Sequence, residues 1–209
     1  MTHKLFKKFF VVIAFTVALV HGNAAVSLSQ DWQILKRAAD SIRTLKSDFI
    51  QKKDLKILKT PLISKGRLYY KAPDLLRWEY FSPLRSIMLK RGESINVYQF
   101  LEGAWKADSS QAVEVRRMIF AEINRWLKGR FNEAGVFTPS YDSGPPIRLI
   151  LIPKEGFKPF LNRIELIFSE RPGIIRSVEM IEPQEARTRI EFTNLEINAH
   201  IPAGFFEKP

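Results

Sequence analysis

The chain of 209 residues has 33 lysine and arginine side chains against 22 acidic ones, a formal charge of +11, and no cysteine. This is the length of a single domain, which has to fold without disulfides and offers no N-terminal cysteine for lipid attachment. The positive charge favours anionic lipid or an acidic protein as a partner; the alternative is a charge that only keeps the protein in solution.

The first 24 residues predict a cleavable signal peptide. Three lysines precede an apolar run at residues 9–20, and Gly22 and Ala24 have the spacing of a cleavage site. The run is about 12 residues long, whereas a membrane span needs about 20; an uncleaved anchor is the alternative. Cleavage leaves residues 25–209 as one domain, which we expect in the periplasm of a Gram-negative cell and therefore without a nucleic-acid partner.

A helix is predicted at the start of the exported domain, with Ser27 or Ser29 as its cap. Apolar residues recur there at spacings of three and four, which places them in one stripe. Such a stripe needs a sheet or another helix to lie against. The stripe consists of Trp32, Leu35, Ala39, Ile42 and Leu45.

From Lys46 to about Trp105 apolar residues recur at every second position, which predicts strands joined by short turns and hence antiparallel pairing. Phe49 begins the first strand, and Leu55–Leu58 is expected to form another. The clearest part is residues 66–91, which has the pattern of three short strands. Its large apolar residues are Leu68, Tyr70, Leu76, Trp78, Tyr80, Ile87 and Leu89, and the alternate positions hold Arg67, Arg77, Glu79, Met88 and Lys90.

A second amphipathic helix is expected between Asp108 and Gly129, and the last third of the chain returns to strands. The fold class is therefore α+β, with one strongly curved antiparallel sheet and two helical segments against its concave side. The sheet face that bears the aromatic residues is either a packed core or a site for an apolar ligand, and periodicity does not separate the two. The four late strands are Ile147–Ile152, Leu161–Phe168, Ile174–Ile181 and Arg187–Ile197.

The sequence contains little that could carry catalysis. After export only His200 remains of the three histidines, and its neighbours form no nucleophile motif. With one histidine and no cysteine there is no zinc-ligand cluster, and no glycine-rich phosphate loop occurs. Acids in the strands, such as Glu79 and Glu165, alternate with arginines and apolar residues as on a solvated sheet face. No catalytic residue, metal ligand or cofactor is predicted.

Several motifs together resemble the LolA family of periplasmic carriers of outer-membrane lipoproteins. The resemblance extends from about residue 28 to residue 207, and its most specific part is residues 49–83. The matching elements are Phe49-x-Gln51-x-Lys53, Gly66-x-Leu68, Lys71-Ala72-Pro73, Leu76-Arg77-Trp78-Glu79-Tyr80 with Pro83, Phe192-x-Asn194, Ile201-Pro202 and Phe205.

The resemblance implies an incomplete antiparallel β-barrel covered by helices, whose apolar concave face holds acyl chains. It implies an acylated lipoprotein or lipid as cargo, an inner-membrane ABC transporter as donor and an outer-membrane lipoprotein receptor as acceptor. Transfer of this kind needs no enzyme activity, and a monomer is expected. The alternative is a periplasmic sensor or scaffold that uses the same fold to bind a protein partner without lipid.

Two sets of residues follow as candidates, together with one departure from the family. Many carriers have arginine where this chain has Ala72, before Pro73, so either the control of a helical lid or the cargo is expected to differ. Basic residues near the cavity are expected to dock partners, namely Arg77, Arg85, Lys90 and Arg91. The cavity is expected to be lined by Phe49, Leu68, Tyr70, Leu76, Trp78, Tyr80, Ile87 and Leu89.

Overall fold

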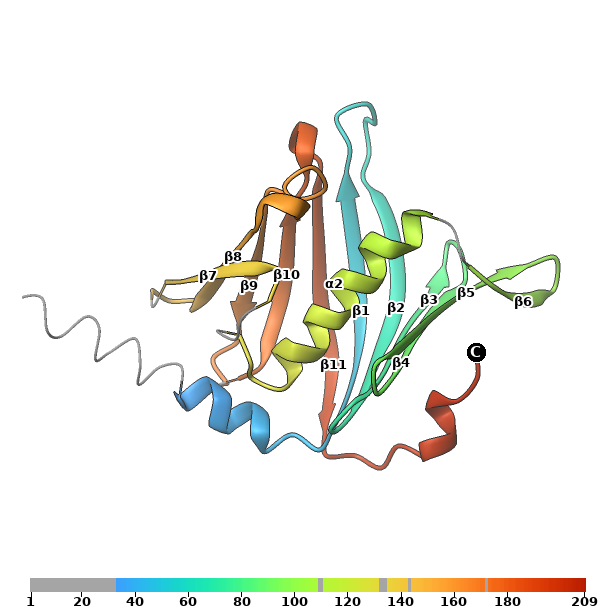
Figure 1. The fold of residues 1–209 in the computed structure, drawn as a ribbon, viewed down its shortest axis with the longest axis horizontal. Coiled ribbons are helices and arrows are strands. Elements are labelled where there is room, and N and C mark those ends of the chain that lie inside the picture. The colour runs from blue at the N-terminus through green and yellow to red at the C-terminus, as the bar shows by residue number, and fades with distance from the viewer. Residues whose placement is uncertain (1–32, 109–110, 132–134, 143, 172) are drawn as a thin grey trace, which may run out of the picture.

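The computed structural model describes residues 33–108, 111–131, 135–142, 144–171 and 173–209. In this part of the chain eleven strands form one antiparallel sheet in the spatial order β6-β5-β4-β3-β2-β1-β11-β10-β9-β8-β7. The described sheet is curved and open, because its outermost strands β6 and β7 do not pair with each other (Figure 1). The predicted signal peptide and the predicted cap of the first helix lie outside the described residues.

Neighbouring strands in the sheet are mostly neighbours in sequence, so most connections are short turns. The exception is the antiparallel pairing of β1 with β11, which joins the first six strands to the last five. The strands are β1 Thr44–Asp54, β2 Leu62–Lys71, β3 Leu75–Ser82, β4 Ser86–Arg91, β5 Ser94–Leu101, β6 Ala104–Ala107, β7 Phe137–Asp142, β8 Arg148–Pro153, β9 Arg163–Phe168, β10 Ile175–Ile181 and β11 Arg187–Ile197.

Besides the sheet, the described residues form two α-helical segments and three short 3-10 turns. Residues 33–40 are helical and precede β1, and helix α2, Gln111–Leu127, lies across one face of the sheet (Figure 1). None of the helices in the described ranges is long and apolar enough to cross a membrane. Three short 3-10 turns are η1 Glu155–Phe157, η2 Pro183–Glu185 and η3 Ala203–Phe206.

The element order differs from the predicted one in three places. Leu55–Leu58 is not a strand but part of the turn between β1 and β2, where the Leu58 N–H donates to the Leu55 carbonyl at 2.9 Å. Strand β1 begins at Thr44, so Leu45 belongs to a strand and not to the first helix. Strand β7 occupies a segment where no strand is predicted, because Pro139 interrupts its pattern.

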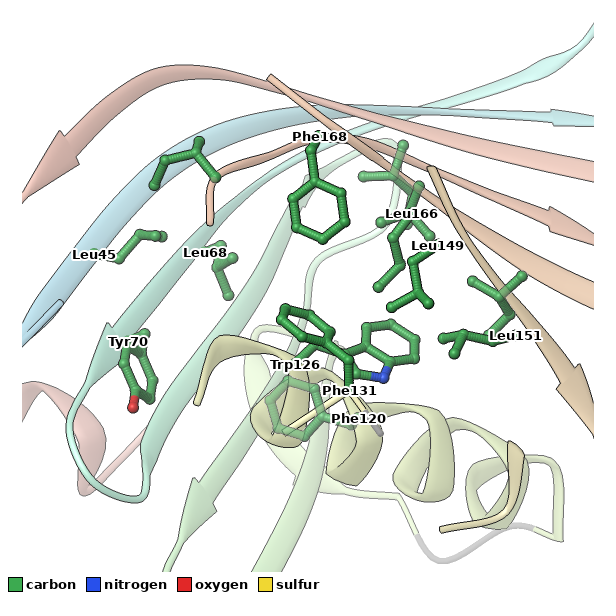
Figure 2. Close-up of a cluster of buried hydrophobic side chains, with 14 of the residues drawn as sticks. Leu45, Leu68, Tyr70, Phe120, Trp126, Phe131, Leu149, Leu151, Leu166 and Phe168 are labelled. Carbon is green, nitrogen blue, oxygen red and sulfur yellow. The ribbon is translucent and has the colours of Figure 1, made fainter. Parts of the chain in front are cut away.

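Apolar side chains of the sheet and of α2 pack together on the face that α2 crosses. Figure 2 shows Leu149 of β8 and Leu166 of β9 facing Phe120 and Trp126 of α2. Leu149 and Leu166 are register partners in neighbouring strands, so their side chains lie on the same face of the sheet. All four side chains are buried, and the core therefore fills the space between this half of the sheet and the helix.

The C-terminal segment covers part of the opposite face of the sheet. After β11 the chain passes along β2, where the Ile201 carbonyl accepts a hydrogen bond from Lys71 Nζ at 3.0 Å. Turn η3 then packs against β3 and β4, and Phe206 and Ile201 are buried with Tyr69 of β2. Around β2 to β4 both faces of the sheet therefore carry buried apolar side chains.

Candidate functional site

A cavity of about 340 Å³ lies between the sheet and helix α2. Its volume falls at the low end of the range of about 300–1,000 Å³ that is usual for ligand pockets. The walls come from β1 to β5, from β10 and β11, and from α2, so segments far apart in the sequence meet there. Most of the lining side chains are aliphatic or aromatic, which suits an apolar ligand.

Three of the predicted cavity residues, Leu68, Trp78 and Tyr80, line this space. Phe49 is buried directly behind them, with its ring 4.5 Å from that of Trp78 and 5.2 Å from that of Tyr80. Leu76 is fully buried in the same hydrophobic cluster. The two interpretations of the aromatic face are therefore not exclusive, because the same face provides both packed core and cavity wall.

Tyr70 lies on the same face but belongs to a second hollow. This hollow lies beside the first helical segment, and its lining includes Arg43, Ala72 and Lys128. Burial raises the pKa of Tyr70 to about 12, and the carboxylate of Asp74 acts in the same direction.

The predicted grouping of Ile87 and Leu89 with the cavity face is wrong. In the register of β3 and β4, Trp78 pairs with Met88, while Ile87 pairs with Glu79 and Leu89 with Arg77. Because paired residues share a face, Met88 lines the cavity and Ile87 and Leu89 point to the other side. They are buried on that side, which is the face where η3 packs against β4.

Two of the four predicted docking residues are also not available for docking. The Arg77 side chain is 8% exposed; its Nη1 donates to the carbonyls of Phe205 at 3.1 Å and Lys208 at 2.7 Å. Lys90 is buried on the cavity side of the sheet, and its Nζ donates to the Gly92 carbonyl. Their function in this structure is to hold backbone segments in place.

The other two predicted docking residues, Arg85 and Arg91, are exposed. The Arg85 guanidinium lies 4.2 Å from the ring centre of Phe100 and 5.3 Å from that of Trp105. Arg91 ends β4 beside the turn at Gly92. Docking of partners by these two arginines remains a prediction.

Several lining residues were not among the predicted site residues. Helix α2 contributes Ile119 and Ile123, and the last strands contribute Val178, Met180 and Ile190. The apolar stripe of α2 was a usable signal, because a helix that covers an apolar face presents that stripe to it. The contribution of β10 and β11 had no comparable signal, since it depends on the pairing of β11 with β1 across the whole domain.

Polar side chains collect at one end of the cavity. Lys53 Nζ lies 2.7 Å from Glu182 Oε2, and the Thr188 hydroxyl donates to Glu182 Oε1 at 2.8 Å. Next to them the Tyr80 hydroxyl donates to Gln51 Oε1 at 2.7 Å. All five residues line the cavity. The cavity thus has a mainly apolar wall and a polar cluster at this end, which suits an amphiphilic ligand. The other polar side chains of the lining are Ser47, Ser86 and Arg116.

Two of the aromatic residues that line the cavity carry polar atoms. Burial raises the pKa of Tyr80 to about 12, so its hydroxyl is protonated at physiological pH. Trp78 Nε1 is buried and makes no hydrogen bond with the described residues. An indole N–H in this position is a donor that a bound ligand could use.

The C-terminal end of α2 is attached to the turn between β2 and β3. Lys128 Nζ donates to Asp74 Oδ1, and Asn124 Nδ2 donates to the same oxygen at 3.3 Å. In the same turn the Ala72 N–H donates to the Arg43 carbonyl at 2.8 Å. The two contacts of Asp74 hold the C-terminal end of the helix to this turn, and the Ala72 contact holds the turn to the segment before β1.

The Asp74 contacts predict a pH-dependent contribution to stability. Its hydrogen bond from Lys128 holds the pKa of the Asp74 carboxyl below its ordinary value of 3.8. The stabilisation is therefore complete at pH values above the pKa of the unfolded chain and is lost as the pH falls through the lower pKa of the folded protein. Asp74→Asn should cost about 0.5–1 kcal/mol at pH 7 and clearly less at pH 2.5, measured by urea unfolding. An equal cost at both pH values would contradict this account.

Comparisons with known proteins identify relatives of the chain. The family model described as outer membrane lipoprotein carrier protein LolA matches residues 40–208. An outer-membrane lipoprotein carrier protein of Dechloromonas aromatica (strain RCB) is 26% identical over 169 residues, which cover 79% of this chain and 76% of that protein.

Solved structures are similar to the chain at low sequence identity. A DUF1329 family protein from Desulfovibrio piger is similar with a TM-score of 0.50 and 10% identity, over 85% of this chain and 96% of that one. A chain of the Pseudomonas aeruginosa MucA/MucB complex gives a TM-score of 0.48 and 12% identity, over 88% of this chain and 61% of that one.

Proposed function

This chain belongs to the LolA family of outer membrane lipoprotein carrier proteins, and from this membership we propose that it carries acyl chains of lipoproteins or related envelope lipids through the periplasm. The observation that carries the proposal is the mainly apolar cavity between the sheet and α2, with a cluster of polar side chains at one end. An acyl chain would occupy the apolar body, and the polar part of the cargo would lie at the end near Lys53 and Glu182.

The energetics of such a carrier are those of the hydrophobic effect. Each methylene group removed from water contributes about 0.8 kcal/mol, so an acyl chain in the cavity is held without any covalent step. Release then requires a downstream site that binds the chain more tightly. An inner-membrane ABC transporter as donor and an outer-membrane lipoprotein receptor as acceptor would complete this route.

Adjacent residues of β10 allow a matched test. Met180 lines the cavity, whereas Ile181, the next residue of the strand, points to the opposite face. Met180→Glu should weaken binding of a fluorescent fatty acid by at least tenfold, because an apolar chain cannot solvate a carboxylate. Ile181→Glu should leave the dissociation constant within about twofold, since it adds the same charge outside the cavity.

Two negative results, taken together, would overturn the proposal. Fatty-acid binding that is absent from the unmodified protein, together with no acylated material in native mass spectra of protein from periplasm, would exclude a lipid carrier. A sensor or scaffold that binds a protein partner would then be the better interpretation of the fold.

A further inference from the structure

The exposed apolar side chains of this protein are concentrated at one end of its strands. Eleven large apolar side chains in the described residues are exposed, and nine of them lie in or beside the turns that follow β1, β3, β5 and β8. These turns share one end of the sheet because the strands are antiparallel. We call this the apolar end. Its nine residues are Ile57, Leu58, Leu62, Ile63, Phe81, Leu84, Leu101, Ile152 and Phe160.

The turn between β1 and β2 is the most exposed part of the apolar end. Ile57 is 89% exposed, and Leu84 in the turn between β3 and β4 is 80% exposed. Figure 1 shows the β1–β2 turn and η2 projecting together, and the ion pair of Lys56 with Glu185 joins them. Side chains this exposed contribute little to the core. Because nine of them gather at one end of the sheet, the group indicates a contact outside the molecule.

The same turn and the strand ends beside it are basic. Residues 52–65 contain five lysines and one acid, Asp54, which gives a local charge of +4. Lys53 and Lys56 form ion pairs with Glu182 and Glu185, and the remaining lysines are Lys52, Lys59 and Lys65. Aliphatic side chains alternating with lysines suit the headgroup region of an anionic bilayer, where the former insert and the latter meet phosphate.

We propose that the apolar end contacts the surface of an anionic phospholipid bilayer, with Ile57 and Leu84 inserted among the headgroups. A second copy of this chain fits less well, because two such turns would repel each other. An acidic protein would match the lysines but leaves the apolar side chains of four separate turns to be covered. Of these three partners, a bilayer surface suits both the exposed apolar side chains and the lysines beside them.

The contact would also orient the cavity. Lys53 ends the wall of β1 just before the β1–β2 turn, and Glu182 directly precedes η2. The polar end of the cavity is therefore at the apolar end of the sheet. In the proposed contact the polar end of the cavity would face the bilayer from which a lipid chain enters. This consequence rests on the proposed carrier function, whereas the membrane contact itself does not.

Flotation with lipid vesicles tests the contact directly. The protein should float with vesicles containing 30% phosphatidylglycerol and much less with pure phosphatidylcholine. Ile57→Glu combined with Leu84→Glu should lower the partition coefficient on the anionic vesicles at least tenfold. Lys59→Gln should lower it by roughly fivefold, the usual contribution of one lysine near an anionic surface. All three sites are exposed, so the variants should keep the stability of the unmodified protein.

The control is Ile34→Glu, which changes an exposed aliphatic residue of the first helical segment, away from the apolar end. Its partition should stay within twofold of the unmodified protein. Flotation unaffected by the double substitution, or absent on anionic vesicles, would overturn the proposal. The Met180→Glu variant separates the two proposals, because it should lose fatty-acid binding and still float with the vesicles. The double variant should bind the fatty acid and no longer float.

Discussion

Replacing Gly66 by alanine is expected to destabilise the protein by about 3 kcal/mol or more. An added Cβ would lie 2.2 Å from Cζ of Phe49 and 2.2 Å from the Glu79 carbonyl oxygen, closer than any packed contact. Gly66 pairs with Phe49 in the register of β1 and β2, and the ring lies against the glycine. The pairing of β2 with β3 also has a register shift between Lys65 and Gly66, so the backbone is already irregular at this position.

The measurement is the free energy of unfolding in urea. Gly156→Ala is the matched control, because a Cβ at Gly156 meets no atom within 4 Å. We expect its effect to stay within about 1 kcal/mol. The same cost at both glycines would show that Phe49 and its neighbours can repack around a methyl group. If the Gly66 variant lost fatty-acid binding but kept its stability, this would also show that Phe49 and its neighbours can repack around the methyl group.

Replacing Arg77 by methionine is expected to cost about 2–4 kcal/mol and to release the C-terminal segment. Methionine keeps much of the volume of the side chain but removes the donors to the carbonyls of Phe205 and Lys208. It also removes the cation from the ring of Phe205, whose centre is 4.6 Å from the guanidinium carbon. The carbonyls of Phe205 and Lys208 then lose the donor that Arg77 provides.

Limited proteolysis reads out the release of that segment, and urea unfolding gives the change in stability. In the Arg77→Met protein the bonds after residue 201 should be cut many times faster than in the unmodified chain. Arg85→Met is the control, since Arg85 is exposed and its guanidinium lies over the rings of Phe100 and Trp105. Its cost should be about 1 kcal/mol or less. Equal proteolysis of the two variants would mean that Arg77 does not hold the segment.

The sequence pattern was sufficient for the strands β2 and β3 and for the face that carries Leu68, Trp78 and Tyr80. Alternation works there because one side of each strand is more apolar than the other. It failed in β4, where Ile87 and Leu89 and their neighbour Met88 are all apolar and both faces are buried. In that case the register follows from the turn between β3 and β4, whose geometry alternation does not encode.

The polar end of the cavity could not be found in the same way. Lys53 and Glu182 are 129 positions apart in the sequence and meet only because β1 pairs with β11 and η2 turns the chain back beside it. Among the basic residues, the sequence instead predicted a site residue where the structure has a structural one. Arg77 looked like a solvated charge in a strand, because nothing local indicates that the C-terminal segment will bring backbone carbonyls to it.

The open sheet leaves two edge strands, and their sequences bear on how the protein avoids self-association. An unpaired strand offers its backbone groups to any other strand, which is the starting point of cross-β aggregation. Strand β6 is only four residues long and contains Lys106, and β7 contains Pro139, which has no N–H to donate. Both edge strands are thus poor templates for pairing with a strand of another chain. The protein therefore resists cross-β association at the two edges that an open sheet leaves unpaired.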